Sequence, residues 1–210
     1  MNCEKSHIDT IIFDLGGVLV DWNPAYLYLK IFNGDEVKTE WFLNNVCTPL
    51  WNMEQDAGRS IAEGEQLKIA EYPEYEQEIK LFYKDWEHMF KGTIQENVIL
   101  FQQLKATKKY KIYALTNWSA EKWEKALQLF PFFNEFDGVV VSGIEKTRKP
   151  FEKIYKILIN RFHIKTENAI FIDDNVDNVK TAIKLKIHGI HYLSQNQLIK
   201  DLESKGINLK

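Results

Sequence analysis

The chain has 210 residues, of which 45% are hydrophobic and 13% aromatic, enough to build a sizeable core and to exclude a wholly disordered chain. The net charge of −3 gives no reason to expect nucleic acid or an anionic membrane as a partner. Two cysteines are too few for a disulfide framework, and no apolar stretch approaches the length of a membrane-spanning helix. We therefore expect a cytoplasmic protein.

Short apolar segments recur along the chain, and helical patterns separate them. The first segment, at 11–13, ends on Asp14 and is followed by a glycine-containing turn. Four further strands are predicted at 110–115, 138–141, 169–172 and 189–193. Helices are predicted at about 94–108, 119–130, 150–162, 176–186 and 195–204. This alternation predicts an α/β fold with a Rossmann-like parallel sheet flanked by helices.

The segment 21–92 interrupts the alternation, because it carries several helical patterns and no convincing strand. Within it, Ser60 and Glu63 have the spacing of a helix-capping box. The simplest architecture is an all-helical cap inserted after the first strand. The predicted α/β core then consists of residues 1–20 and 93–210, and the cap of residues 21–92.

Polar residues follow three of the predicted strands. Parallel strands bring their carboxyl ends to one edge of the sheet, so Asp14, Thr116 and the pair Asp173 and Asp174 are expected to converge there. Lys149 is expected to begin a helix at the same edge. Each residue alone has an ordinary explanation as a turn, a cap or an exposed charge. Together they supply a carboxylate, a hydroxyl, a cation and further acids, which are the groups that phosphoryl transfer requires.

The chemistry of these groups can be assigned from their types. Asp14 can attack phosphorus and form an aspartyl-phosphate. Mg²⁺ prefers oxygen ligands and would bridge Asp14 and Asp174. Thr116 and Lys149 would bind the phosphoryl oxygens, because catalysis of this kind consists mainly of positioning and charge stabilisation.

The same residues make the chain resemble the haloacid dehalogenase (HAD) superfamily of hydrolases. Four motifs occur in order: Phe-Asp-Leu-Gly-Gly-Val-Leu at 13–19, Leu-Thr-Asn at 115–117, Lys-Pro at 149–150, and Phe-Ile-Asp-Asp at 171–174. The insert resembles the family's C1-type cap, so the resemblance spans nearly the whole chain. It implies that Asp14 is the nucleophile and that Asp174 is the principal acidic metal ligand, with Asp173 as an auxiliary acid.

Four further residues are expected to contact the substrate: Gly16, Gly17, Asn117 and Arg59. Arg59 lies in a polar, glycine-containing stretch of the insert that would suit a loop reaching towards the site. It either binds a substrate anion or forms a surface salt bridge. Trp22 and Trp118 lie beside the first two motifs, where they either line the mouth of the pocket or pack the cap on the core.

The chain departs from the family pattern at Gly16. Most phosphatases of the superfamily carry a second aspartate there, two residues after the nucleophile, as general acid and base. The backbone carbonyl of Gly16 can still bind a metal ion, but the proton donor, worth about 10²–10⁴-fold in rate, is missing. A similar Asp-Leu-Gly pattern occurs in a subgroup resembling bacterial sugar-phosphate phosphatases, glucose-1-phosphate phosphatase among them. Asp21 is a possible substitute, with a hinge or cap role as the alternative.

The sequence thus predicts a Mg²⁺-dependent phosphatase of small phosphorylated metabolites, sugar phosphates first, that is a monomer or a homodimer. One alternative is a metal-independent 2-haloacid dehalogenase, although that branch usually lacks paired acids like Asp173 and Asp174. A phosphomutase is a less favoured alternative, because it would depend even more than a phosphatase on the acid that is missing at Gly16. A third alternative is a non-catalytic protein that binds a phosphorylated ligand or a protein partner.

Overall fold

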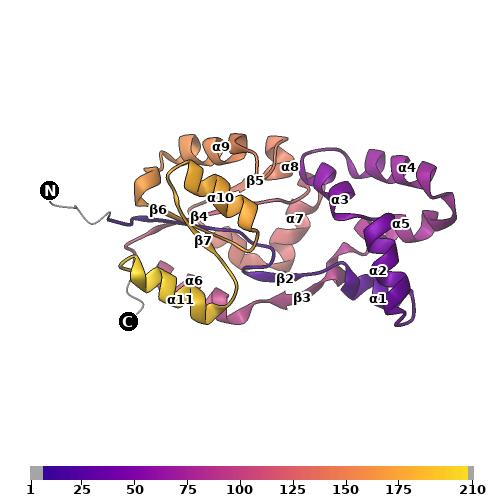
Figure 1. Ribbon diagram of the computed structural model, residues 1–210, viewed down its shortest axis with the longest axis horizontal. Coiled ribbons are helices and arrows are strands. Elements are labelled where there is room, and N and C mark those ends of the chain that lie inside the picture. The colour runs from indigo at the N-terminus through magenta and orange to yellow at the C-terminus, as the bar shows by residue number, and fades with distance from the viewer. Residues whose placement is uncertain (1–6, 208–210) are drawn as a thin grey trace.

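A computed structural model describes residues 7–207 of the chain (Figure 1). Its centre is a five-stranded sheet in which every neighbouring pair is parallel, in the order β5-β4-β1-β6-β7. The strands are β1 (Thr10–Phe13), β4 (Lys111–Thr116), β5 (Gly138–Val141), β6 (Ala169–Asp173) and β7 (His188–His191). The predicted α/β fold and the predicted positions of all five strands are therefore confirmed.

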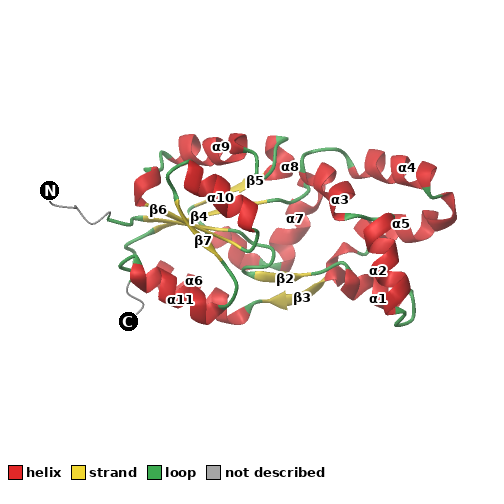
Figure 2. Cartoon of the chain, in the orientation of Figure 1, coloured by secondary structure: helices red, strands yellow, loops and turns green. Residues whose placement is uncertain are grey.

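Helices cover both faces of this sheet (Figure 2). They are α6 (Gln95–Ala106), α7 (Ala120–Leu129), α8 (Ser142–Glu145), α9 (Glu152–Phe162), α10 (Val176–Lys184) and α11 (Gln195–Ser204), with short 3₁₀ turns η3 (Pro131–Glu135) and η4 (Thr166–Asn168). Successive residues of β1 point to opposite faces, so Ile11 and Phe13 join the core shared with α6 and α11. Ile12 joins the core shared with α9 and α10. Because β1 is buried on both sides, the residue that follows it has a fixed position.

The remaining helices gather at one end of the molecule, beyond β2 and β3 in Figure 1. They are α1 (Ala25–Ile31), α2 (Glu36–Asn45), α3 (Pro49–Asp56), α4 (Ile61–Glu71) and α5 (Glu76–Lys84), with 3₁₀ turns η1 (Pro73–Tyr75) and η2 (Trp86–Met89). Tyr28, Phe42 and Phe82 pack together among them, with ring centroids 4.7 and 6.3 Å from Tyr28. Ser60 caps α4 by accepting a hydrogen bond from the backbone N–H of Glu63 at 3.2 Å, as its spacing predicts.

The expectation that segment 21–92 contains no strand is wrong at both of its ends. β2 (Val20–Trp22) and β3 (Phe90–Thr93) form an antiparallel pair in which Val20 lies opposite Thr93. Both strands are very short, and their partners are far apart in the sequence, so neither shows a local strand pattern. The pair holds together the two segments through which the helical insert joins the sheet. The exact division into core and cap stays a prediction.

Within the described residues, no helix is both long enough and apolar enough to cross a membrane.

Candidate active site

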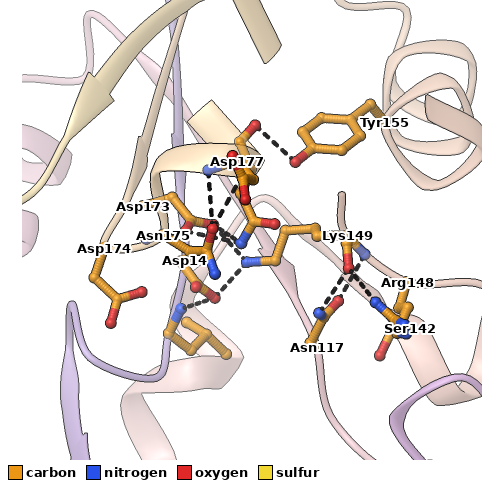
Figure 3. A network of polar contacts seen from close by, with 12 residues as sticks. Asp14, Asn117, Ser142, Arg148, Lys149, Tyr155, Asp173, Asp174, Asn175 and Asp177 are labelled. Atoms are coloured by element: carbon orange, nitrogen blue, oxygen red, sulfur yellow. Dashed lines mark hydrogen bonds and ion pairs between the residues drawn. The ribbon is translucent and has the colours of Figure 1, made fainter. Parts of the chain in front are cut away.

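Three strands end side by side at the carboxyl edge of the sheet. Phe13 at the end of β1 pairs with Ala114 of β4 and with Ile172 of β6, and the backbone N–H of Asp14 donates to the carbonyl of Ile172 at 2.8 Å. The structure therefore brings Asp14, Thr116, Asp173 and Asp174 to one place, as the parallel topology predicts. Figure 3 shows the polar network at this edge.

Lys149 lies at the centre of the network. Its ammonium Nζ is 2.7 Å from Asp14 Oδ1 and 2.7 Å from Asp173 Oδ2, and its side chain is 1% exposed. Burial alone would lower the pKa of Lys149, but the two carboxylates outweigh burial and the net shift is upward, so the residue stays a cation. For an acid the effect of burial has the opposite sign: burial raises the pKa of the Asp14 carboxyl, and the Lys149 ammonium opposes that rise.

Lys149 lies before α9, and not at its start as expected. The helix begins at Glu152, because a residue followed by proline is disfavoured in helical geometry. The side chain of Asn117 fixes the backbone of Lys149 instead: it accepts from the Lys149 N–H at 2.8 Å and donates to the Lys149 carbonyl at 3.1 Å. Asn117 thus holds the cation in position, in addition to lining the cavity described below.

The two acids after β6 have different surroundings. Asp173 is fully buried and accepts hydrogen bonds from Lys149 Nζ, from the backbone N–H of Asn175 and from the side chain of Asn178. Asp174 is exposed to the cavity, and burial and the Asp173 charge raise its pKa. Asp173 therefore orients Lys149, while the Asp174 carboxylate is available to a ligand. Asn178, at the start of α10, is not among the residues that the sequence predicts for the site.

The acids suit a metal ion. Asp14, Asp173 and Asp174 each offer one carboxylate oxygen, and the three oxygens lie within 4.8 Å of one another. Oxygen ligands of this kind suit Mg²⁺. A methyl group at Gly17 would overlap the Asp174 carboxylate, and the residue has φ +71°, so only glycine lets the turn approach Asp174. At Gly16, by contrast, no atom lies within 4 Å of the position that a Cβ would take.

Two adjoining cavities open onto this site. The larger is lined by residues that include Asp14, Gly16, Lys149 and Asp174. The smaller has aromatic walls formed by Trp22, Tyr83, Trp86, Phe90 and Trp118. Both are lined by Gly16, Trp22, Asn52, Asp56 and Asn117. The site thus lies between the sheet edge and the helical insert.

Two polar atoms at the site have no partner among the described residues. The Thr116 hydroxyl is buried, with 1% of the residue exposed, and the indole N–H of Trp118 is also buried. An unpaired buried polar group costs roughly 1–3 kcal/mol. Trp118 also lines the smaller cavity, whereas Thr116 ends β4 beside Asp14 and lines neither cavity.

Arg59 is not brought to the other site residues. Its Nε donates to Gln55 Oε1 at 2.7 Å and its guanidinium donates to the carbonyl of Trp51 at 3.1 Å, both within the insert, and it lines neither cavity. Asp21 accepts from the hydroxyl of Tyr26 at 3.0 Å and also lines neither.

Comparison with known proteins agrees with this geometry. The haloacid dehalogenase-like hydrolase family matches residues 8–186. A sesquiterpene phosphatase from Aspergillus oryzae is 24% identical over 185 residues, covering 86% of this chain and 87% of that protein. A flavin mononucleotide hydrolase from Arabidopsis thaliana is 31% identical over 111 residues, covering 51% of this chain and 43% of that protein.

Among solved structures, a HAD family enzyme from Bacteroides thetaiotaomicron in complex with magnesium has a TM-score of 0.69 and 21% identity. The alignment covers 92% of this chain and 98% of that one. This similarity supports the fold. Together with the family match over residues 8–186, it shows that the chain belongs to the haloacid dehalogenase-like hydrolases.

Proposed function

We propose that the protein is a Mg²⁺-dependent phosphatase that hydrolyses small phosphorylated metabolites through an aspartyl-phosphate on Asp14. The observation that carries the proposal is the buried Asp14 carboxylate, held by Lys149 and adjacent to the free carboxylate of Asp174. The unpaired Thr116 hydroxyl at the same edge supports it, because a phosphoryl oxygen would satisfy it. Two relatives named as a phosphatase and a nucleotide hydrolase support the reaction class.

The residues of the chain prepare the nucleophile. Asp14 Oδ1 accepts from the backbone N–H of Leu15 at 2.7 Å and from Lys149, which fixes the orientation of the carboxylate. Attack by Asp14 forms an oxygen–phosphorus bond while the ester oxygen–phosphorus bond breaks. Lys149 and the Thr116 hydroxyl stabilise the charge on the phosphoryl oxygens. Mg²⁺, held by Asp14, Asp174 and the Gly16 carbonyl, would neutralise phosphate charge when bound.

The helical insert, α1–α5, is proposed to act as a C1-type cap that selects the substrate. Sugar phosphates remain our first substrate class, because the Asp-Leu-Gly pattern at 14–16 resembles the sugar-phosphate phosphatase subgroup. The aromatic walls of the smaller cavity would equally suit a flat or apolar group. A substrate panel should therefore include sugar phosphates, a flavin nucleotide and an isoprenoid phosphate.

The experiment is hydrolysis of this panel and of 4-nitrophenyl phosphate, with and without Mg²⁺, for the wild type and for Asp14→Asn. Metal-dependent phosphate release that the substitution abolishes supports the proposal. Halide release from a 2-haloacid without added metal would instead support the dehalogenase alternative. No turnover of any substrate, despite binding of Mg²⁺, would support the non-catalytic alternative.

A further inference from the structure

The position that normally carries the general acid is empty of side-chain atoms. A Cβ built on Gly16 meets nothing within 4 Å, and Gly16 lines both cavities. A leaving group that occupies either cavity therefore reaches this open space. Since glycine offers no proton, the donor has to come from another element.

Asp56 is the acid that the fold brings to this space. It is the last residue of α3, it is half-buried, and it lines both of the cavities that Gly16 lines. Its Oδ2 accepts a hydrogen bond from Asn52 Nδ2, one turn earlier, at 3.3 Å. The side chain thus enters the site from the insert, opposite the sheet edge.

The insert and the core are packed closely next to Asp56. A Cβ on Gly58 would lie 3.1 Å from the carbonyl of Gly143 in α8, so the chain after α3 runs directly over the core. Further along, the backbone N–H of Ile61 donates to Glu121 Oε1 of α7 at 2.7 Å. These contacts hold the end of α3, and therefore Asp56, at a fixed place relative to the strands.

The other acids of the site already have roles. Among the described residues that line the larger cavity, the carboxylates are those of Asp14, Asp56 and Asp174. Asp14 is the proposed nucleophile and Asp174 the proposed metal ligand. In the smaller cavity Asp56 is the one carboxylate among the described lining residues. Of the described carboxylates that line the two cavities, Asp56 is therefore the one without a role so far, and it is available for proton transfer.

The electrostatic surroundings of Asp56 suit that task. Burial raises its pKa to about 7, although the nearby cations of Arg148 and Lys149 and the backbone N–H of Ser119 oppose the rise. Tyr83 of α5 also faces it, and the Asp56 charge adds to the burial that raises the pKa of that phenol. A carboxyl that titrates near neutrality can both donate and accept a proton at working pH.

We propose that Asp56 is the general acid and base of this phosphatase, in place of the acid missing at Gly16. The inference rests on the proposed function. In the first step, the Asp56 carboxyl gives its proton to the ester oxygen as the bond from that oxygen to phosphorus breaks and Asp14 becomes phosphorylated. In the second step, the Asp56 carboxylate takes a proton from water as the water oxygen bonds to phosphorus, which releases phosphate and the free Asp14 carboxylate.

The test is the leaving-group dependence of kcat/KM for Asp56→Asn. With 4-nitrophenyl phosphate, whose phenolate leaves without help, kcat/KM stays close to that of the wild type. With phenyl phosphate and with an alkyl phosphate that the wild type hydrolyses, it falls by about 10²–10⁴-fold. The alkaline limb of the wild-type pH profile for the alkyl phosphate, near pH 7, disappears in the variant. The matched control is Glu54→Gln, which removes an exposed carboxylate from the same helix. It should change neither the leaving-group dependence nor the pH profile of kcat/KM.

A rescue variant separates proton transfer from a structural role. Gly16→Asp combined with Asp56→Asn puts a carboxyl into the open space at position 16 and should restore at least part of the lost rate with alkyl phosphates. Equal leaving-group dependence for the wild type and Asp56→Asn would overturn the inference and leave the proposed function intact. If the wild type hydrolyses none of these phosphates, the proposed function fails and the inference fails with it.

Discussion

Replacing Lys149 with methionine tests the buried charge network at the centre of the site. The ammonium is 1% exposed and 2.7 Å from each of two carboxylates, so its removal leaves Asp14 and Asp173 close together without their shared cation. Removing one partner of a buried ion pair costs about 3–5 kcal/mol. Asp173 keeps its hydrogen bonds from Asn175 and Asn178, which prevents a larger loss. We therefore expect Lys149→Met to lower the free energy of unfolding by about 3–5 kcal/mol and the Tm by roughly 10 °C.

Urea unfolding followed by circular dichroism, without added metal, measures this difference. Lys153→Met is the control, because Lys153 is exposed on α9, and its free energy of unfolding should stay within about 0.5 kcal/mol of the wild type. In a double-mutant cycle, Asp173→Asn and Lys149→Met should be clearly less destabilising together than the sum of the two. A loss below about 1 kcal/mol for Lys149→Met would refute the assignment of the network.

Three further substitutions, the first with Gly16→Ala as its matched control, have defined outcomes. Gly17→Ala should weaken Mg²⁺ binding by calorimetry at least tenfold and cost about 1–2 kcal/mol, because the methyl group meets the Asp174 carboxylate at a positive φ; Gly16→Ala, in open space, should unfold like the wild type. Thr116→Val should leave stability unchanged or raise it, since it removes an unpaired buried hydroxyl, while it weakens inhibition by inorganic phosphate; a loss of stability would contradict this. Asp56→Asn should be more stable than the wild type at pH 8 and equal to it at pH 4. The folded wild type binds more protons than the unfolded chain between pH 4 and about 7, so its stability falls as pH rises, by at most about 4 kcal/mol; a pH-independent difference would contradict this.

The sheet could be predicted because each of its strands is a short apolar segment between helical patterns. The convergence of Asp14, Thr116 and Asp173 follows from the same reasoning, since parallel strands end at one edge. The pair β2 and β3 could not be predicted, because its pairing joins residues at opposite ends of the insert. Neither strand is long enough to show an alternation of apolar and polar residues.

Side-chain roles were harder to predict than positions. The two adjacent acids of the fourth motif look equivalent in the sequence. In the structure, however, the Asp173 carboxylate accepts hydrogen bonds from three residues, whereas Asp174 lines the larger cavity. Asn117 holds the backbone of Lys149, a contact between distant segments that no local pattern indicates. Asp56 is one acid among several in a polar stretch. Only the packing of the insert on the core shows that it lines the site.

The central claim is that Asp14 becomes phosphorylated during turnover. The most direct measurement is mass spectrometry of the protein quenched in acid during Mg²⁺-dependent hydrolysis of 4-nitrophenyl phosphate and then treated with borohydride, which reduces an aspartyl-phosphate to homoserine. The account predicts homoserine at position 14, dependent on substrate and absent from unreacted protein. Steady turnover with Asp14 unmodified, or with the modification on another residue, would contradict it.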